Sequence, residues 1–289
     1  MYVLDEYDIN GLEIKVVGEL TDGVYHTPSL TVDLDPAPEL GPQWKLLGGG
    51  GRVGDNINPR SATNSLLTAM APLSAYNWTV RGKDHFIADE EWAEAFCVAG
   101  RLIPNADYSW TPKDSLVDAH PSALATPPPG FVLVGGGAIV HWEGAGSMLY
   151  QSKPEYVNPN IGWGWRASAK DHMESSPAKL TAYAIGLSQT FLNSYGVRVI
   201  YISGTSEVEA SYSGASSYVD GERAWVVTGG AETTWRPGDA GSLLTGSFPG
   251  SVFRDGDPRR RRQWWAYSKD QQVESPSRAT SWAIAIIPA

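Results

Sequence analysis

The chain has 289 residues, a formal net charge of -10 at pH 7 and a sequence pI of about 5.0. This acidic balance excludes a general affinity for nucleic acid or for an anionic membrane surface, because a surplus of Lys and Arg attracts those partners. The single cysteine, Cys97, excludes an intramolecular disulfide and a thiolate metal cluster.

The N-terminal segment, residues 1–8, is acidic and has neither the basic stretch nor the apolar run of a secretory signal. No stretch approaches the roughly 18 apolar residues of a membrane span. We therefore expect a soluble protein without membrane insertion. It would be cytoplasmic, or released by lysis or by a route other than the Sec pathway.

One pattern of residues occurs three times in the chain. In order it comprises a Gly pair, a Ser followed by two large apolar residues, a Pro, a Trp, a Lys-Asp pair and a closing apolar segment. From Ser to Pro is seven positions in each copy, from Trp to Lys five, and from Lys to the closing aromatic thirteen. These anchors are Ser65, Pro72, Trp78, Lys83 and Phe96; Ser147, Pro154, Trp165, Lys170 and Tyr183; and Ser242, Pro249, Trp264, Lys269 and Trp282. Fixed spacing of this kind indicates an internal repeat.

The closing segments alternate large and small apolar residues. In the second copy Tyr183, Ile185 and Leu187 alternate with Ala182, Ala184 and Gly186, and this period of two predicts a strand. Both faces are apolar, which indicates an interior strand of a covered sheet. The aligned Trp78, Trp165 and Trp264 are interpreted as core residues.

The chain ends soon after the third closing segment, so each unit is expected to close on such a strand. This phase predicts three units, 1–103, 104–187 and 188–289. Units of roughly 85 to 100 residues suit a small antiparallel β-sandwich. We expect an all-β protein of three tandem sandwich-like modules. They would form either three separate domains or one body with pseudo-threefold symmetry.

The separation from Pro to Trp varies, with 6, 11 and 15 positions in the three copies. Insertions are absorbed by surface loops, so these segments are expected to be loops. The longest contains the run Arg259–Arg262, the only concentrated positive charge. It could hold a phosphate, a sulfate or a sialic carboxylate, or it could pair with Asp255 and Asp257.

A resemblance rests on the string Gly-Phe-Val-Leu-Val-Gly-Gly-Gly-Ala at 130–138. It is followed by Ser-x-Pro, a Gly/Trp pair and the closing Leu-Thr-Ala-Tyr-Ala-Ile at 180–185. This arrangement resembles a β-module repeated in secreted and phage-associated bacterial proteins. The resemblance implies a small β-module and carries no single activity and no agreed site residues. Many members hold paired cysteines near these strands, and this chain does not.

The candidate site lies at the Lys-Asp turns. If the four strands of a copy form an antiparallel meander, the first and third connections lie at the same end. The turn of Lys170, Asp171 and His172 would then lie beside the loop of Trp142, with His141 and Glu143. The corresponding sets are Lys83, Asp84 and His85 in the first copy, and Lys269, Asp270 and Trp235 in the third.

A cation, a carboxylate, an imidazole and an indole at one end are the groups of a sugar-binding cleft. Sugar hydroxyls take hydrogen bonds while the C–H face of the ring stacks on Trp. A structural interpretation stays open, in which each Asp satisfies loop amides and each Lys stem lies on apolar surface. Gln271 replaces the His in the third copy, so a catalytic histidine in all three copies is excluded.

Enzyme motifs are few. Gly49-x-Gly-x-x-Gly54 formally matches a dinucleotide fingerprint, but no helical pattern follows it. We expect no enzyme, no cofactor and no metal site. The function predicted is a multivalent, lectin-like protein that recognises a glycan or a cell-surface receptor, with avidity from three copies. The alternatives are a structural component of a phage tail or injection particle, with homo-oligomer or particle assembly, and a hydrolase without a recognisable motif.

Overall fold

The computed structural model describes residues 1–23, 25–35, 43–54, 65–85, 91–219, 224–235, 240–254, 257–271 and 273–289, with the main chain alone described between residues 251 and 261. The protein is all-β, as the sequence predicts. In this part of the chain the one α-helix is α1 (Gln189–Ser194), and a single 3-10 turn, η1, spans Asn105–Asp107. No described helix has the length and apolar character needed to cross a membrane.

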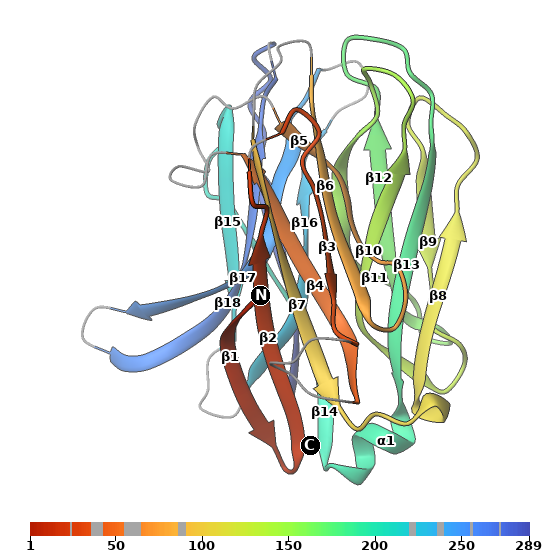
Figure 1. Ribbon diagram of the computed structural model, residues 1–289, viewed down its shortest axis with the longest axis vertical. Coiled ribbons are helices and arrows are strands. Elements are labelled where there is room, and N and C mark those ends of the chain that lie inside the picture. Colours follow the sequence, from red (N-terminus) through yellow and green to blue (C-terminus); the bar gives the residue numbers. More distant parts are fainter. Residues whose placement is uncertain are drawn as a thin grey trace.

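The strands form three antiparallel sheets (Figure 1). The first sheet comprises, in order, β1 (Tyr2–Ile9), β2 (Leu12–Leu20), β7 (Trp92–Arg101), β4 (Trp44–Gly54), β17 (Leu243–Arg254), β18 (Asp257–Lys269) and β15 (Tyr212–Tyr218). The second comprises β3 (Ser29–Asp33), β6 (Asn77–Asp84), β5 (Ser65–Pro72), β10 (Phe131–His141), β13 (Lys179–Ser188) and β8 (Tyr108–Asp114). The third comprises β14 (Val197–Thr205), β19 (Ala279–Pro288), β16 (Trp225–Thr233), β11 (Met148–Asn158), β12 (Gly162–Lys170) and β9 (Ser122–Ala125).

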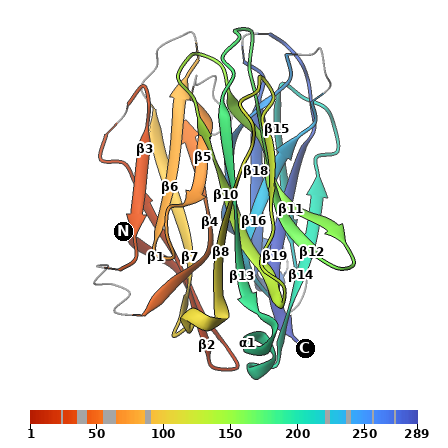
Figure 2. The same ribbon diagram turned by 90° about the vertical axis from the view of Figure 1, so that its right-hand side faces the viewer.

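Each sheet combines strands from two of the three units expected from the sequence. Short pairings join the halves: β5 with β10 in the second sheet, β11 with β16 in the third and β17 with β4 in the first. Figure 2 shows β3, β6, β5 and β10 side by side across one such join. The sheets therefore run across the positions at which the units were expected to end.

The expectation of a four-strand meander is wrong. The Gly-Gly strand β4 pairs with β7, whereas β5 pairs with β6 in a different sheet. Strand β6 instead lies face to face with β4, and its Trp78 and Val80 side chains lie against Gly49 and Gly51. Two layers bury both apolar faces against each other, which a single meander cannot do.

The tryptophans expected in the core are there, each at most 2% exposed. Each indole lies directly on a glycine of a Gly-Gly strand: Trp78 on Gly49, Trp165 on Gly136 and Trp264 on Gly229. A Cβ atom at Gly49 would lie 2.6 Å from the Trp78 ring. The Gly-Gly segments are therefore needed for close packing between the two layers.

The closing segments form β7, β13 and β19, and each pairs with a strand on both sides, as an interior strand should. Phe96 of β7 is buried, with 5% of its surface exposed. Tyr183 and Trp282 are only half-buried, although Ile185 and Ile284, two positions further along the same strands, are fully buried. Covering of both faces, expected from the apolar alternation, is therefore incomplete in these two strands.

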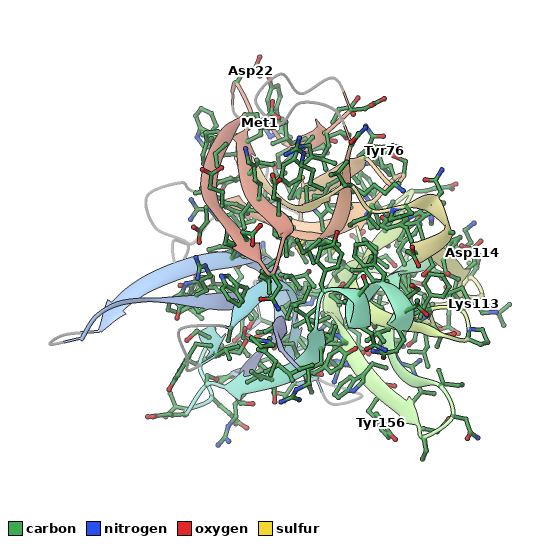
Figure 3. All side chains as sticks on the ribbon, turned by 90° about the horizontal axis from the view of Figure 1, so that it is seen from below. Met1, Asp22, Tyr76, Lys113, Asp114 and Tyr156 are labelled. Atoms are coloured by element: carbon green, nitrogen blue, oxygen red, sulfur yellow. The ribbon has the colours of Figure 1, made fainter. Side chains whose placement is uncertain are left out.

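Two long hairpins, β11–β12 and β17–β18, extend from the body (Figures 1 and 2). Figure 3 shows Tyr156 on the first of them, far from the centre of the molecule. The run Arg259–Arg262 lies in β18, so the expectation of a loop there is wrong: the longer insertion lengthens a hairpin. Arg262 pairs with Asp5 at 2.8 Å, and the side chains of residues 259–261 lie outside the described part.

Candidate functional site

The three lysines of the Lys-Asp turns are buried, with 1–2% of their surface exposed. Lys83 donates hydrogen bonds to the carbonyl oxygens of Gly144, at 2.7 Å, and of Gly146, and its ammonium lies 4.3 Å from the centre of the Trp142 ring. Burial lowers the pKa of Lys83 to about 8, although the charge of Asp171 opposes this shift. The lysine of one expected unit therefore binds the loop of the next.

The same relationship recurs at the second turn. Lys170 donates to the carbonyl oxygen of Ala240, and its ammonium lies 5.5 Å from the ring of Trp235. Trp235 is also packed against His120 and Tyr150, at 4.7 and 5.5 Å between ring centres. The sequence predicted Lys170 beside Trp142. The structure pairs Trp142 with Lys83, because consecutive strands lie in different sheets.

The three aspartates accept hydrogen bonds from their surroundings. Each accepts one from the serine that starts the Ser-Leu-Leu segment: Ser65 to Asp84 at 2.9 Å, Ser147 to Asp171 at 3.0 Å and Ser242 to Asp270 at 2.5 Å. Asp171 and Asp270 also accept from the backbone amides of Ser176 and Ser275, both at 2.7 Å. Asp84 also pairs with His26 at 3.1 Å.

The third residues of the turns meet at one place. The rings of His85 and His172 lie edge to face, 5.1 Å apart. Gln271 joins them, since its carbonyl accepts from His172 at 2.6 Å and its side-chain amide donates to the carbonyl of His85 at 3.4 Å. All three are at most 4% exposed. The turns therefore hold three distant parts of the chain together, and these contacts favour the structural interpretation.

An open groove of about 480 Å³ lies on the outer side of the second sheet, next to Trp142. Its lining comes from the segment before and at the start of β3, from β5 and β6, and from the end of β10 with the loop that follows. The lining residues are Thr27, Pro28, Ser29, Thr68, Arg81, Gly82, Ile139, Val140, His141, Trp142 and Glu143. The groove therefore spans the join between β5 and β10.

Arg81, His141 and Glu143 are exposed in this groove, and Trp142 is half-buried. The only hydrogen bond described for the Arg81 side chain runs from Nε to the Thr79 hydroxyl at 3.4 Å. Burial and the nearby charges of Lys179 and Arg81 lower the pKa of His141. The groove thus offers a planar cation, an indole, an imidazole and a carboxylate.

An aromatic pair continues the surface beyond Ile139. Tyr183 packs against the cluster that contains Ile139, and its ring stacks on Trp110 at 5.6 Å with an angle of 18° between the planes. Trp110 is 37% exposed. The charge of Arg81 acts on both His141 and Tyr183, so the guanidinium lies within electrostatic range of both side chains.

Hydrogen bonds fix His141 at the edge of the groove. The Thr181 hydroxyl lies 2.8 Å from His141 Nε2 and donates to Asp114 Oδ1 at 2.7 Å. Since the hydroxyl has one proton, which it gives to Asp114, His141 must be the donor to Thr181. This order of hydrogen bonds orients the imidazole, and it does not activate Thr181 as a nucleophile.

The sequence singled out Trp142, His141 and Glu143 and missed Arg81. The signal that could have found it is the strand period of two, which puts the side chains of Arg81 and Lys83 on the same face. The described residues bring no three His, Cys, Asp or Glu side chains into a metal-binding cluster. No protein-family model matches the chain, and no curated protein matches its sequence.

Proposed function

We propose that the chain is a lectin-like protein of three copies of one module around a pseudo-threefold axis, and that it binds a glycan in the groove beside Trp142. Irregularities in strand pairing support the repeat, because they fall at matching positions. In β4, β10 and β16 the register shifts lie between Leu46 and Gly48, Leu133 and Gly135, and Val226 and Thr228. A second set lies between Leu67 and Ala69, Leu149 and Gln151, and Leu244 and Gly246. Bulges are conserved features of a fold, so matching sets favour a common origin.

The observation that carries the binding proposal is the groove itself. It is open, it has about the volume of a small-ligand site, and it presents an indole together with several hydrogen-bonding groups. Sugar rings are held by stacking on an aromatic face and by hydrogen bonds to their hydroxyls. The Lys83 ammonium lies 4.3 Å from the centre of the Trp142 ring and holds the indole in place. The Lys-Asp turns then build the site without contacting the sugar.

A glycan array with the full chain tests the proposal. Trp142→Ala should abolish binding to the glycan that the unaltered protein binds. Trp235→Ala is the matched control, since Trp235 holds the equivalent position over Lys170 but lies outside the groove. Equal loss of binding in both variants, with both folded, would locate the binding elsewhere. An array on which the unaltered protein binds no glycan would contradict the proposal.

The second candidate is a component of a phage tail or injection particle. The protruding hairpins β11–β12 (Figure 2) and β17–β18 (Figure 1) favour it, because such extensions give self-contact in assemblies. Mass measurement by light scattering separates the two functions. A monomer that binds a glycan contradicts the particle role, whereas a trimer or polymer that binds none contradicts the lectin role.

A further inference from the structure

The three modules proposed above place equivalent positions on the outer side of each sheet, at the join between two modules. Counting from the aligned serines and tryptophans, Ala69, Ala71 and Arg81 of the second sheet correspond to Gly246, Phe248 and Tyr267 of the first and to Gln151, Lys153 and Ser168 of the third. The pairings across the joins agree with this alignment: Ile139 opposes Ala69, Arg52 opposes Gly246 and Glu232 opposes Gln151.

At the join of the first sheet, the protein's own side chains fill the equivalent space. Phe248 stacks between Phe96 and Tyr267, at 5.6 and 5.7 Å. Arg52 lies over the Phe248 ring at 5.3 Å and pairs with Glu94 at 2.5 Å. The cation at this join therefore has its carboxylate within the same chain.

Side chains of the protein also fill the join of the third sheet, and there too a cation pairs with a carboxylate. Lys153 pairs with Glu232 at 2.8 Å and lies 5.1 Å from the centre of the Trp282 ring. Gln151 donates to the same carboxylate at 2.9 Å. At this join too, the cation has a carboxylate and an aromatic ring of the same chain as its partners.

At the join of the second sheet the two central side chains are Ala69 and Ala71, which are buried in a cluster with Ile139 and Tyr183. The groove described above lies beside this cluster, with Ile139 and Arg81 in its lining. Among the described residues no carboxylate pairs with Arg81, although one pairs with the cation at each of the other two joins. Of the three groups found at the other joins, a cation, an aromatic ring and a carboxylate, the second join lacks a carboxylate partner for its cation among the described residues.

We infer that the groove binds an acidic saccharide of the uronate type, whose carboxylate pairs with Arg81 while its ring lies against Trp142. The inference rests on the proposed lectin function and gives it one glycan class and one binding site per chain. A guanidinium holds a carboxylate with two parallel hydrogen bonds, a geometry that an ammonium cannot reproduce. The other titratable groups of the lining are His141, whose imidazole is held by Thr181, and Glu143.

The test uses the full chain and calorimetry with oligogalacturonate, oligoglucuronate and alginate fragments, each beside its methyl ester. The ester keeps the sugar backbone and masks the carboxylate. We expect one molecule bound per chain, with binding of the acid and loss of affinity of about tenfold to a hundredfold for the ester. Arg81→Gln should give a similar loss for the acid and no change for the ester.

Two variants control for non-specific electrostatics. Arg81→Lys keeps the positive charge but cannot donate two parallel hydrogen bonds to a carboxylate. The affinity of this variant for the acidic saccharide should therefore fall by about tenfold. Arg198→Gln removes an exposed cation from β14, outside the groove, and should leave the affinity unchanged. Equal binding of acid and ester, or of neutral glycans alone, would overturn the inference and leave the lectin function intact. Binding of no glycan would overturn both.

Discussion

The imidazole rings of His85 and His172 lie edge to face with their centres 5.1 Å apart, although 87 positions separate them in the chain (172 − 85). Both rings are buried where the three Lys-Asp turns meet, and Gln271 completes the group. Burial is the main cause that lowers both pKa values, to about 4 for His85. Burial therefore favours the neutral form of both imidazoles at the meeting point of the turns.

Acid should weaken the fold through these histidines. The folded protein binds the His85 proton less well than the unfolded chain, whose ordinary pKa is about 6.5. Stability from this group is therefore complete above pH 6.5 and falls as the pH decreases toward 4, by up to about 3 kcal/mol. The pKa of His172 is also lowered by burial, so this residue too should reduce the stability of the fold in acid.

The measurement is urea unfolding at a series of pH values between 7.5 and 4.5, for the unaltered protein and for His85→Gln with His172→Gln. Glutamine is the conservative choice, because Gln271 already fills the third position. The double variant should lose less stability on acidification than the unaltered protein. Parallel pH profiles would show that other groups, such as the carboxylates, cause the acid sensitivity.

The glycines under the tryptophans should not tolerate a side chain. In Gly136→Ala the new Cβ would overlap the Trp165 ring and the carbonyl oxygen of Tyr183. We expect a loss of about 1 to 3 kcal/mol in the free energy of unfolding, as for overpacking of a core. Gly23→Ala is the control, since its nearest atoms, 3.3 Å away or more, are the flexible end of Tyr25. A change of equal size in both variants would contradict the packing role.

The aspartates of the turns should matter for stability. Asp171→Ala leaves the Ser176 amide without its acceptor and removes one of the two acceptors of the Ser147 hydroxyl, and should cost about 1 to 3 kcal/mol. Asp84→Ala should also reduce stability, because it removes the acceptor of the Ser65 hydroxyl and the partner of His26. Thermal melts beside the glycan assay decide between the two interpretations. Loss of binding without loss of stability in Asp171→Ala would restore the turn as the ligand site.

Local patterns in the sequence were sufficient to predict several of the strands and their buried residues. Period-two alternation identified the closing strands, and the fixed spacing placed Trp78, Trp165 and Trp264 in the core, where the structure has them. Such features depend on residues a few positions apart, so they can be recognised from the sequence alone. The length of the β17–β18 hairpin could not be predicted from the sequence, because a variable segment can extend a strand as well as a loop.

The sequence by itself determined that this protein is built of β-strands and that tryptophan and glycine occur at matched positions. Only the tertiary structure decided which strands share a sheet. It placed β4 and β5 in different sheets and joined β5 to β10, so that Lys83 meets Trp142 and Arg81 faces an open groove. The physical reason is that strand pairing is satisfied by any backbone, whatever its side chains, and the choice of partner depends on how distant apolar faces are buried together.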